Sequence, residues 1–297
     1  MRITCCCLAI ALASLLSAAL AQGQNLFVTS SAGGNPNDHH IYEFTPDGTR
    51  STFASSLASG EGLAFDSAGN LFESDWDGNV FEFMPGRAQS TFASGLGHLY
   101  GMAFNNAGNL FVVAGWPSGT IYQFTPQGVR STFASGLNGP YGLAFNSMGD
   151  LFVSDEYGGE IYKITPGGSR STFASGLIDP TGLAFDSAGN LLVSQGSPTY
   201  PNGSGNITKF TPKGTSSTFA SSGLGNLPYG LAFDSAGNLF VASAYIYKIA
   251  PDGTQSIFAG NLDSPGFLAF QLVPEPSTWV MVGIGAVALF GIRRRGY

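Results

Sequence analysis

Histidine is the scarcest of the side chains that could do chemistry in this sequence. Only His39, His40 and His98 are present. His39 and His40 follow Asp38 in a polar segment, which could bind a metal or act as a base but is equally typical of a surface loop. Serine is frequent, yet the serines fall in repeated segments and turns, so no Ser-His-Asp set can be assigned. We therefore predict no catalytic residue.

A second set of candidates precedes a recurring Gly-Leu-Ala-Phe word. The residue before the glycine of this word is a candidate ligand-binding residue in five copies, at Glu61, Tyr100, Tyr141, Thr181 and Tyr229. The sixth copy reads Ser264-Pro265-Gly266 at this place. Three tyrosines and a carboxylate could stack on and hydrogen-bond a sugar or an aromatic ring. They could instead pack on one another and fill a central channel.

Asp75, Trp116 and Asp155 complete the candidate ligand-binding set. Asp75 and Asp155 stand at the end of a second repeated word, and Trp116 stands in a variable segment that follows another copy of it. A divalent metal such as Ca²⁺ needs several converging oxygen ligands. Among the residues before the glycine, Glu61 is the only carboxylate. We therefore predict neither a metal site nor another cofactor, with Ca²⁺ or another divalent metal in a channel as the alternative.

These residues are placed by a repeat of about 40 residues that occurs six times. Each unit contains a Gly-Leu-Ala-Phe word, an Asn-Leu-Phe-Val-Ser word, an Ile-Tyr-Lys-Ile-Thr word and a Ser-Thr-Phe-Ala-Ser word, always in this order. Turn segments rich in Asp, Asn, Pro and Gly separate the words. Each unit therefore predicts four short antiparallel strands, which we call a, b, c and d.

Six four-stranded units of this period predict an all-β fold, a six-bladed β-propeller. The first strand expected after the N-terminal segment is a b strand at 26–30, and the last is a lone a strand at 267–270. One C-terminal strand and three N-terminal strands would complete the sixth blade and close the ring. A linear solenoid is the alternative, but it would not need complementary ends.

The loops of such a propeller fall on two faces. The a–b and c–d turns are short and nearly identical between units, so they predict one plain face. The b–c and d–a loops differ from unit to unit and share the opposite, variable face. Loops that differ among copies of one repeat are where a binding surface is built.

The repeat itself, for example residues 140–168, resembles the NHL-repeat and gluconolactonase-like propellers. The resemblance covers about residues 25–271 and implies the propeller fold. The group includes lactonases, lyases and binding modules, so it does not imply one activity. A gluconolactonase-like metal site implies Glu, Asn and Asp ligands that converge on the channel, and this sequence has mainly tyrosine there.

The N-terminal segment 1–21 predicts a secretory signal peptide, with one arginine, an apolar run and Ala19-Leu20-Ala21 before the cleavage point. All three cysteines, Cys5, Cys6 and Cys7, fall inside it. After cleavage the chain would have no thiol for disulfides or metal binding.

The C-terminal segment 272–297 differs from the repeats. Pro274-Glu275-Pro276 precedes an apolar run at 278–292 and a cluster of Arg293, Arg294 and Arg295. As a helix the run would measure about 22 Å, short of a hydrocarbon core of about 30 Å, so it predicts a short transmembrane-like helix that inserts at most marginally. The three parts resemble the PEP-CTERM sorting signal (also labelled the ice-binding-protein C-terminal domain). This resemblance implies recognition by an exosortase-type membrane protease and passage to the cell surface or extracellular matrix.

Charge limits the partners. Residues 22–272 contain 18 Asp and Glu against 8 Lys and Arg, a difference of −10. Nucleic-acid binding depends on clustered Lys and Arg, so nucleic acid is not expected as a partner.

The sequence thus predicts a signal peptide at 1–21, a propeller at 22–271 and a sorting signal at 272–297. We expect an exported protein of the cell envelope, surface or matrix, which contacts the inner membrane transiently through its C-terminus. Its expected function is non-catalytic binding of extracellular polysaccharide or surface protein through the variable face. The alternatives are a secreted lactonase- or lyase-type enzyme acting in the channel and a structural spacer of the matrix.

Overall fold

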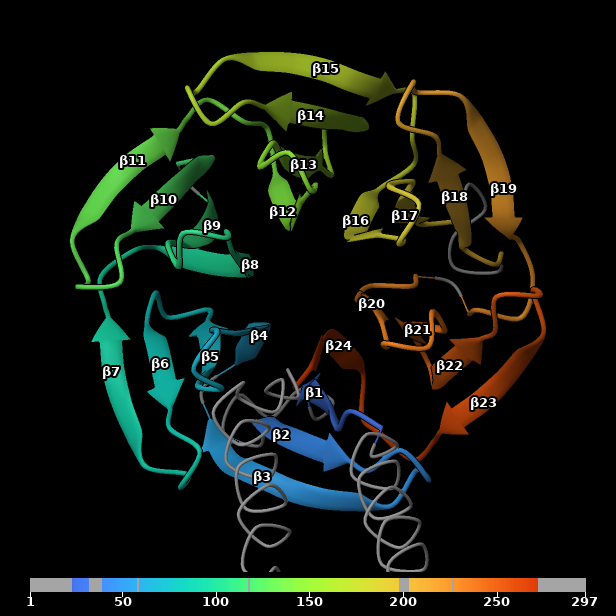
Figure 1. The fold of residues 1–297 in the computed structure, drawn as a ribbon, viewed down its shortest axis with the longest axis horizontal. Coiled ribbons are helices and arrows are strands. Elements are labelled where there is room, and N and C mark those ends of the chain that lie inside the picture. Colours follow the sequence, from blue (N-terminus) through green and yellow to red (C-terminus); the bar gives the residue numbers. More distant parts are fainter. Residues whose placement is uncertain are drawn as a thin grey trace, which may run out of the picture.

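The computed structural model describes residues 23–31, 39–57, 59–116, 118–197, 203–225 and 227–271. In these residues, 24 strands form six four-stranded sheets around a common axis (Figure 1). The predicted all-β, six-bladed propeller is confirmed. The predicted signal peptide and the predicted C-terminal helix lie outside the described residues. Within the described ranges, no helix has the length and apolar character needed to cross a bilayer.

Each blade is ordered a, b, c, d from the axis outwards, as Figure 1 shows. The inner a strands are β4 (Gly60–Phe65), β8 (His98–Phe104), β12 (Pro140–Phe145), β16 (Pro180–Phe185), β20 (Leu231–Phe233) and β24 (Pro265–Phe270). The b strands are β1 (Leu26–Ser31), β5 (Leu71–Asp75), β9 (Leu110–Trp116), β13 (Leu151–Asp155), β17 (Leu191–Gln195) and β21 (Leu239–Ala242). The c strands are β2 (His39–Phe44), β6 (Val80–Phe83), β10 (Thr120–Phe124), β14 (Glu160–Ile164), β18 (Asn206–Phe210) and β22 (Ile246–Ile249). The outer d strands are β3 (Arg50–Leu57), β7 (Gln89–Ala93), β11 (Arg130–Ala134), β15 (Arg170–Ser175), β19 (Ser216–Ala220) and β23 (Gln255–Ala259).

The ring is closed by strands from both ends of the described chain. β24 pairs antiparallel with β1, and Val28 lies opposite Leu268 in this register. We number the blade that contains β24, β1, β2 and β3 as blade 1, and blades 2 to 6 follow in chain order. The closure predicted from the phase of the repeat is therefore confirmed.

Neighbouring blades pack through a repeated group of three phenylalanines. The Phe72 ring of β5 meets Phe92 of the outer strand of its own blade edge to face, with centroids 5.2 Å apart, and Phe104 of the next blade's inner strand at 5.0 Å. Phe27, Phe111, Phe152 and Phe240 occupy the same place in other blades. In blade 5, Leu192 fills it and packs near Phe219 and Phe233. The Ser-Thr-Phe-Ala-Ser and Gly-Leu-Ala-Phe words thus supply the two outer rings of each group.

A ring of hydroxyl groups joins the inner strands. The Ser154 hydroxyl accepts a hydrogen bond from the Gly142 backbone N–H of its own blade at 2.8 Å and donates to the Thr181 carbonyl of the next blade at 2.6 Å. Ser74, Ser194 and Thr29 make the same pair of bonds. These hydroxyls satisfy buried backbone groups between blades, so the repeat serines are structural.

The a–b turns lie on one face of the propeller, which we call the plain face. On the plain face, the a–b turns are closed by an Asp or Asn side chain: Asp66 Oδ1 accepts hydrogen bonds from the N–H groups of Ala68 and Asn70. Both ends of the described propeller also lie on this face. The Gln271 N–H donates to the Asn25 carbonyl at 3.0 Å, and Gln24 accepts from Ser235 in the β20–β21 turn. The segment that follows residue 271 therefore starts on the plain face.

Candidate functional site

The tyrosines predicted at the channel mouth come together on the axis. The Tyr141 ring lies 4.9 Å from that of Tyr100 and 6.3 Å from that of Tyr229, measured between centroids. Enclosure of their hydroxyl groups by the protein raises the pKa of Tyr100 to about 12 and that of Tyr141 well above its ordinary value. These side chains remain neutral at physiological pH, and they contact one another rather than surrounding an open site.

Phe267 is a fourth ring in this group and was not among the residues predicted from the sequence. It stands in β24 where five blades have a glycine, such as Gly142 in β12. Its ring stacks on Tyr141 at 5.5 Å with an interplanar angle of 15°. Because blade 1 lies opposite blade 4 in the ring (Figure 1), this contact crosses the axis. The channel is thus packed with aromatic side chains at this level.

Thr181, the fourth candidate at the mouth, does not join the tyrosines. Its side chain is fully buried, and its hydroxyl donates to the Pro228 carbonyl at 2.9 Å and lies 3.0 Å from the Ser194 hydroxyl. Thr181 therefore belongs to the hydrogen-bonded wall between blades 5 and 6.

Asp75 and Asp155 are also buried, and both hold loops of the variable face. Asp75 accepts hydrogen bonds from the backbone and side chain of Asn79 at 2.7 and 2.9 Å. Asp155 accepts from the N–H groups of Asn138 at 2.8 Å and Gly158 at 3.2 Å, which lie in two different loops. The two aspartates position the loops that carry Trp76 and Tyr157, and do not present their carboxylates to a ligand.

Glu61 lies near the axis beside a second carboxyl group, Glu73, which the sequence analysis did not single out. Burial raises the pKa of Glu61 to about 8. Glu73 is 0% exposed, and neither of its oxygens has a hydrogen-bond partner. Burial, with the charges of Asp75 and Glu61, raises the pKa of Glu73 well above its ordinary value. Both glutamates are therefore expected to be largely protonated at neutral pH.

A row of aromatic side chains crosses the variable face from blade 2 to blade 3. The His98 ring lies 4.9 Å from Trp76 and 5.3 Å from Trp116, between centroids. His98 Nδ1 lies 2.9 Å from the Trp76 carbonyl oxygen, which fixes the imidazole between the two indoles. Trp76 is 44% exposed and Trp116 63%, so this row presents apolar ring surface to solvent.

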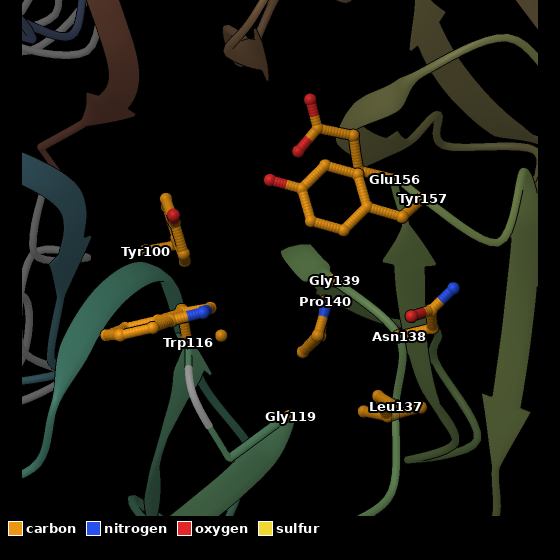
Figure 2. Close-up of a pocket in the computed structure, with 10 residues that line it drawn as sticks. Tyr100, Trp116, Gly119, Leu137, Asn138, Gly139, Pro140, Glu156 and Tyr157 are labelled. Carbon is orange, nitrogen blue, oxygen red and sulfur yellow. The ribbon is translucent and has the colours of Figure 1, made fainter.

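Trp116 also forms one wall of a pocket between blades 3 and 4. The pocket has a volume of about 130 Å³ and is lined by Tyr100, Gly115, Trp116, Gly119, Leu137, Asn138, Gly139, Pro140, Glu156 and Tyr157. Figure 2 shows Tyr100 and Trp116 on one side and Glu156 and Tyr157 on the other. Tyr157 is 72% exposed. The pocket thus offers three aromatic rings and one carboxyl group to a molecule in solution.

Two glycines seat the tyrosines of this pocket. A Cβ atom on Gly115 would lie 2.5 Å from Cε2 of Tyr100, and one on Gly139 would lie 2.7 Å from Cδ2 of Tyr157. Each ring therefore rests directly on backbone, which no other residue type would allow without movement. The loop of Tyr157 is held further by the hydrogen bond from the Glu156 N–H to the Gly139 carbonyl at 2.8 Å.

Charges are divided unequally between the two faces. The described b–c and d–a loops contain no Lys or Arg. The cations of the described chain lie in the c and d strands and the c–d turns: Arg50, Arg87, Arg130, Lys163, Arg170, Lys209, Lys213 and Lys248. Two of their side chains reach d–a loops, where Arg50 donates to the Asn261 carbonyl and Arg170 to the carbonyls of Ser135 and Gly136. Three of these cations form ion pairs: Arg87 with Glu43 at 3.1 Å, Lys163 with Asp150 at 2.8 Å and Lys209 with Asp186 at 3.1 Å. The charged residues of the described b–c and d–a loops are Asp77, Glu156, Asp179 and Asp263, and all four are acidic. Burial and the charge of Asp179 raise the pKa of Glu156 in the pocket.

The described residues contain no group of three or more His, Asp or Glu side chains arranged to hold a metal ion. His39 and His40 begin β2, and Asp38, their neighbour in sequence, lies outside the described residues.

Comparison with known proteins identifies the C-terminal segment. Residues 272–295 match the PEP-CTERM protein-sorting motif. The motif marks an exported protein that is processed by an exosortase, a membrane protease, and sorted to the cell envelope or surface. Pro274, Glu275, Pro276 and the arginines 293–295 lie inside the match. No curated protein matches this sequence.

Solved structures share the propeller. A chain of a nidogen/laminin complex superposes with a TM-score of 0.71 at 18% identity, covering 84% of this chain and 98% of that one. A gluconolactonase from Xanthomonas campestris gives 0.64 at 20% identity, with 84% and 92% covered. Virginiamycin B lyase from Staphylococcus aureus gives 0.58 at 14% identity, with 72% and 77% covered. At these identities the likeness shows the fold alone. The chain is therefore an exported six-bladed β-propeller, of the fold found in gluconolactonases, that carries a PEP-CTERM sorting motif.

Proposed function

We propose that this chain is a non-catalytic binding protein of the cell surface or extracellular matrix, and that its variable face binds polysaccharide through the pocket between blades 3 and 4. The observation that carries the proposal is the placement of Trp116 and Tyr157 on opposite sides of this pocket, each more than half exposed.

Exposed aromatic rings favour a carbohydrate ligand. A sugar has faces of C–H groups that pack on aromatic rings, and hydroxyl groups that bond to polar side chains at the ring edges. The pocket supplies both, with Tyr100, Trp116 and Tyr157 as rings and Asn138 and Glu156 as polar groups. The row of Trp76 and His98 continues the aromatic surface beyond the pocket, which suits a polymer longer than one sugar unit.

The position of the sorting motif supports the same use. The motif begins at residue 272, directly after Gln271 on the plain face. A chain held by this end, at the membrane during processing or at the surface afterwards, would present the variable face away from its attachment. The partners proposed on this basis are an exosortase-type protease at the tail, the inner membrane transiently, and an extracellular polysaccharide at the pocket.

The groups on the axis favour binding over catalysis. Glu61 is protonated at neutral pH because its pKa is about 8, and the neighbouring tyrosines pack against one another and against Phe267. A lactonase or lyase acting in the channel would need this aromatic group to open.

Affinity electrophoresis and a glycan array test the proposal. The probes are the extracellular polymer purified from the cells that make the protein, together with neutral and amine-bearing polysaccharides. We expect Trp116→Ala and Tyr157→Ala to weaken binding by about tenfold or more each, because aromatic contacts in a binding site contribute about 1–2 kcal/mol.

Tyr245→Ala is the matched control, since Tyr245 is an exposed aromatic residue of the variable face in blade 6, away from the pocket. Equal losses for Tyr245→Ala and Trp116→Ala would contradict the assignment of the pocket. A protein that binds none of the probes, in cells whose matrix is unchanged without it, would contradict polysaccharide binding and favour a spacer.

A further inference from the structure

We propose that the pocket between blades 3 and 4 is an aromatic cage for an ammonium group, and that the polysaccharide bound there carries free amino sugars, such as glucosamine units. This inference rests on the proposed function, because it specifies the chemical class of its ligand.

The arrangement of rings suits a cation. Tyr100 and Trp116 line one wall and Tyr157 the opposite wall (Figure 2), so a group in the pocket has aromatic rings on two sides. A cation within about 6 Å of the face of an aromatic ring is attracted by its quadrupole, most strongly by Trp. The volume of about 130 Å³ is room for roughly four water-sized groups. That space holds an ammonium group and the part of the sugar ring that carries it.

A carboxyl group completes the cage. Glu156 belongs to the same wall as Tyr157, and the lining residues include neither Lys, Arg nor His. Burial and the charge of Asp179 raise the pKa of Glu156, so both disfavour its ionised form in the unbound protein. A bound ammonium group would place a positive charge beside Glu156 and so favour its ionised form.

The charged residues in the loops of the variable face favour the same class of ligand. The described b–c and d–a loops contain the carboxyl groups of Asp77, Glu156, Asp179 and Asp263 and no Lys or Arg. Such a face repels polyanions and attracts polycations. An acidic extracellular polysaccharide is therefore disfavoured, and an amine-bearing one is drawn to the pocket.

Two oligosaccharides of equal length and linkage make the test: fully N-acetylated chitohexaose and fully deacetylated chitosan hexamer. Titration calorimetry of the propeller at pH 6 and low salt should show at least about tenfold tighter binding of the deacetylated hexamer. Glu156→Gln should abolish this preference, because it weakens binding of the deacetylated hexamer by about tenfold and that of the acetylated hexamer by much less. Trp116→Ala should weaken both, and tetramethylammonium chloride should compete with the deacetylated hexamer more strongly than sodium chloride at the same ionic strength.

Asp77→Asn is the matched control, because it removes one negative charge from an exposed position in the neighbouring loop without touching the pocket. It should leave most of the preference intact. Equal binding of the two hexamers, or equal effects of Glu156→Gln and Asp77→Asn, would overturn the ammonium cage and leave polysaccharide binding standing. Binding of alginate in preference to both hexamers would also overturn it. A failure to bind any saccharide would overturn the proposed function itself.

Discussion

In blade 2, the side chain of Glu73 in β5 fills the space beside Gly60 in the neighbouring strand β4. A Cβ atom on Gly60 would lie 2.5 Å from Glu73 Oε1, so the glycine leaves the space that the buried carboxyl group fills. At the position of Glu73 the other blades have a valine, as at Val153, and at the position of Gly60 four of them have a proline, as at Pro140. Blade 2 thus departs from the repeat at two positions together.

This matching predicts strong coupling between the two positions. Gly60→Ala should lower the free energy of unfolding by about 1–3 kcal/mol, because the added methyl group displaces a buried side chain. In the Glu73→Val background most of that cost should disappear, and Glu73→Val alone should stabilise the protein by removing a buried carboxyl group without a hydrogen bond. Urea unfolding of the four variants measures the cycle.

Gly62→Ala provides the control for this cycle. Its Cβ would lie 2.4 Å from the Tyr100 backbone carbonyl oxygen, which Glu73 does not influence directly. Gly62→Ala should therefore destabilise the protein to a similar degree in both backgrounds. A cost of Gly60→Ala that is independent of residue 73 would show that the space is not shared.

The two glutamates near the axis predict that stability falls towards alkaline pH. Burial raises the pKa of Glu61 from 4.5 to about 8 and that of Glu73 well above 4.5. Between the unfolded-state pKa and the folded-state pKa of each glutamate, the folded protein holds a proton that the unfolded protein has released. The free energy of unfolding therefore decreases as pH rises. The slope is at most about 1.4 kcal/mol per pH unit for each group. For Glu61 this decrease in the free energy of unfolding levels off above about pH 8, because the folded state then releases its proton as well.

Unfolding in urea from pH 5 to 9 measures this dependence. The double variant Glu61→Gln, Glu73→Gln should show a clearly shallower decline, because neither amide titrates. The acids with a lowered pKa, such as Asp150 and Asp186, titrate below this range and do not contribute to its slope. Parallel curves for the two proteins would contradict the protonated state of the glutamates.

Ring closure predicts unequal effects of two truncations. A chain that ends at Gln271 retains β24, whereas a chain that ends at Ser264 loses Leu268 and Phe270 from the packing between blades 1 and 6. Loss of buried Leu and Phe side chains costs about 2–5 kcal/mol each, so Tm should fall by more than about 10 °C in the shorter chain. Differential scanning calorimetry compares the two, and similar Tm values would mean that β24 is not needed to hold the ring together.

Processing of the tail is expected to depend on the sorting motif rather than on the propeller. Replacing Pro274 and Pro276 by alanine should leave the protein at its unprocessed mass, because we expect the protease to recognise the Pro-Glu-Pro part of the motif. Intact mass spectrometry of protein from cells gives the result. Pro251→Ala, in a turn of the plain face, should be processed normally. Unchanged processing of the double variant would show that another part of the tail is recognised.

The repeat made the fold predictable and left much of the site hidden. Recurrent words placed the strands and their phase predicted closure, since strand patterns and turn residues are local properties. Thr181 was expected at the mouth but lies in the wall, where its hydroxyl bonds to the Pro228 carbonyl and lies beside the Ser194 hydroxyl. The register shift after Pro180 recurs after Pro140, so it does not distinguish Thr181 from Tyr141. A short hydroxyl side chain bonds to nearby groups, whereas a tyrosine ring extends to the other rings on the axis.

Two further residues did leave a signal. Glu73 breaks a column of valines and Phe267 breaks a column of glycines when the units are aligned on strand registers. Departures from a repeat thus indicate special positions even without related sequences. The pocket, by contrast, depends on how the loop of Glu156 and Tyr157 folds over Gly139, and loop conformation follows from contacts that no local pattern specifies.

The pairing of β24 with β1 also has a mechanical consequence. A pull on the tail would act first on β24, along the direction of the strand and out through the plain face. Hydrogen bonds of an antiparallel pair run perpendicular to the strands, so such a pull loads them in shear, together rather than one after another. The closing strand of the propeller is therefore well suited to bear tension from an attached C-terminus while the opposite face holds a polymer.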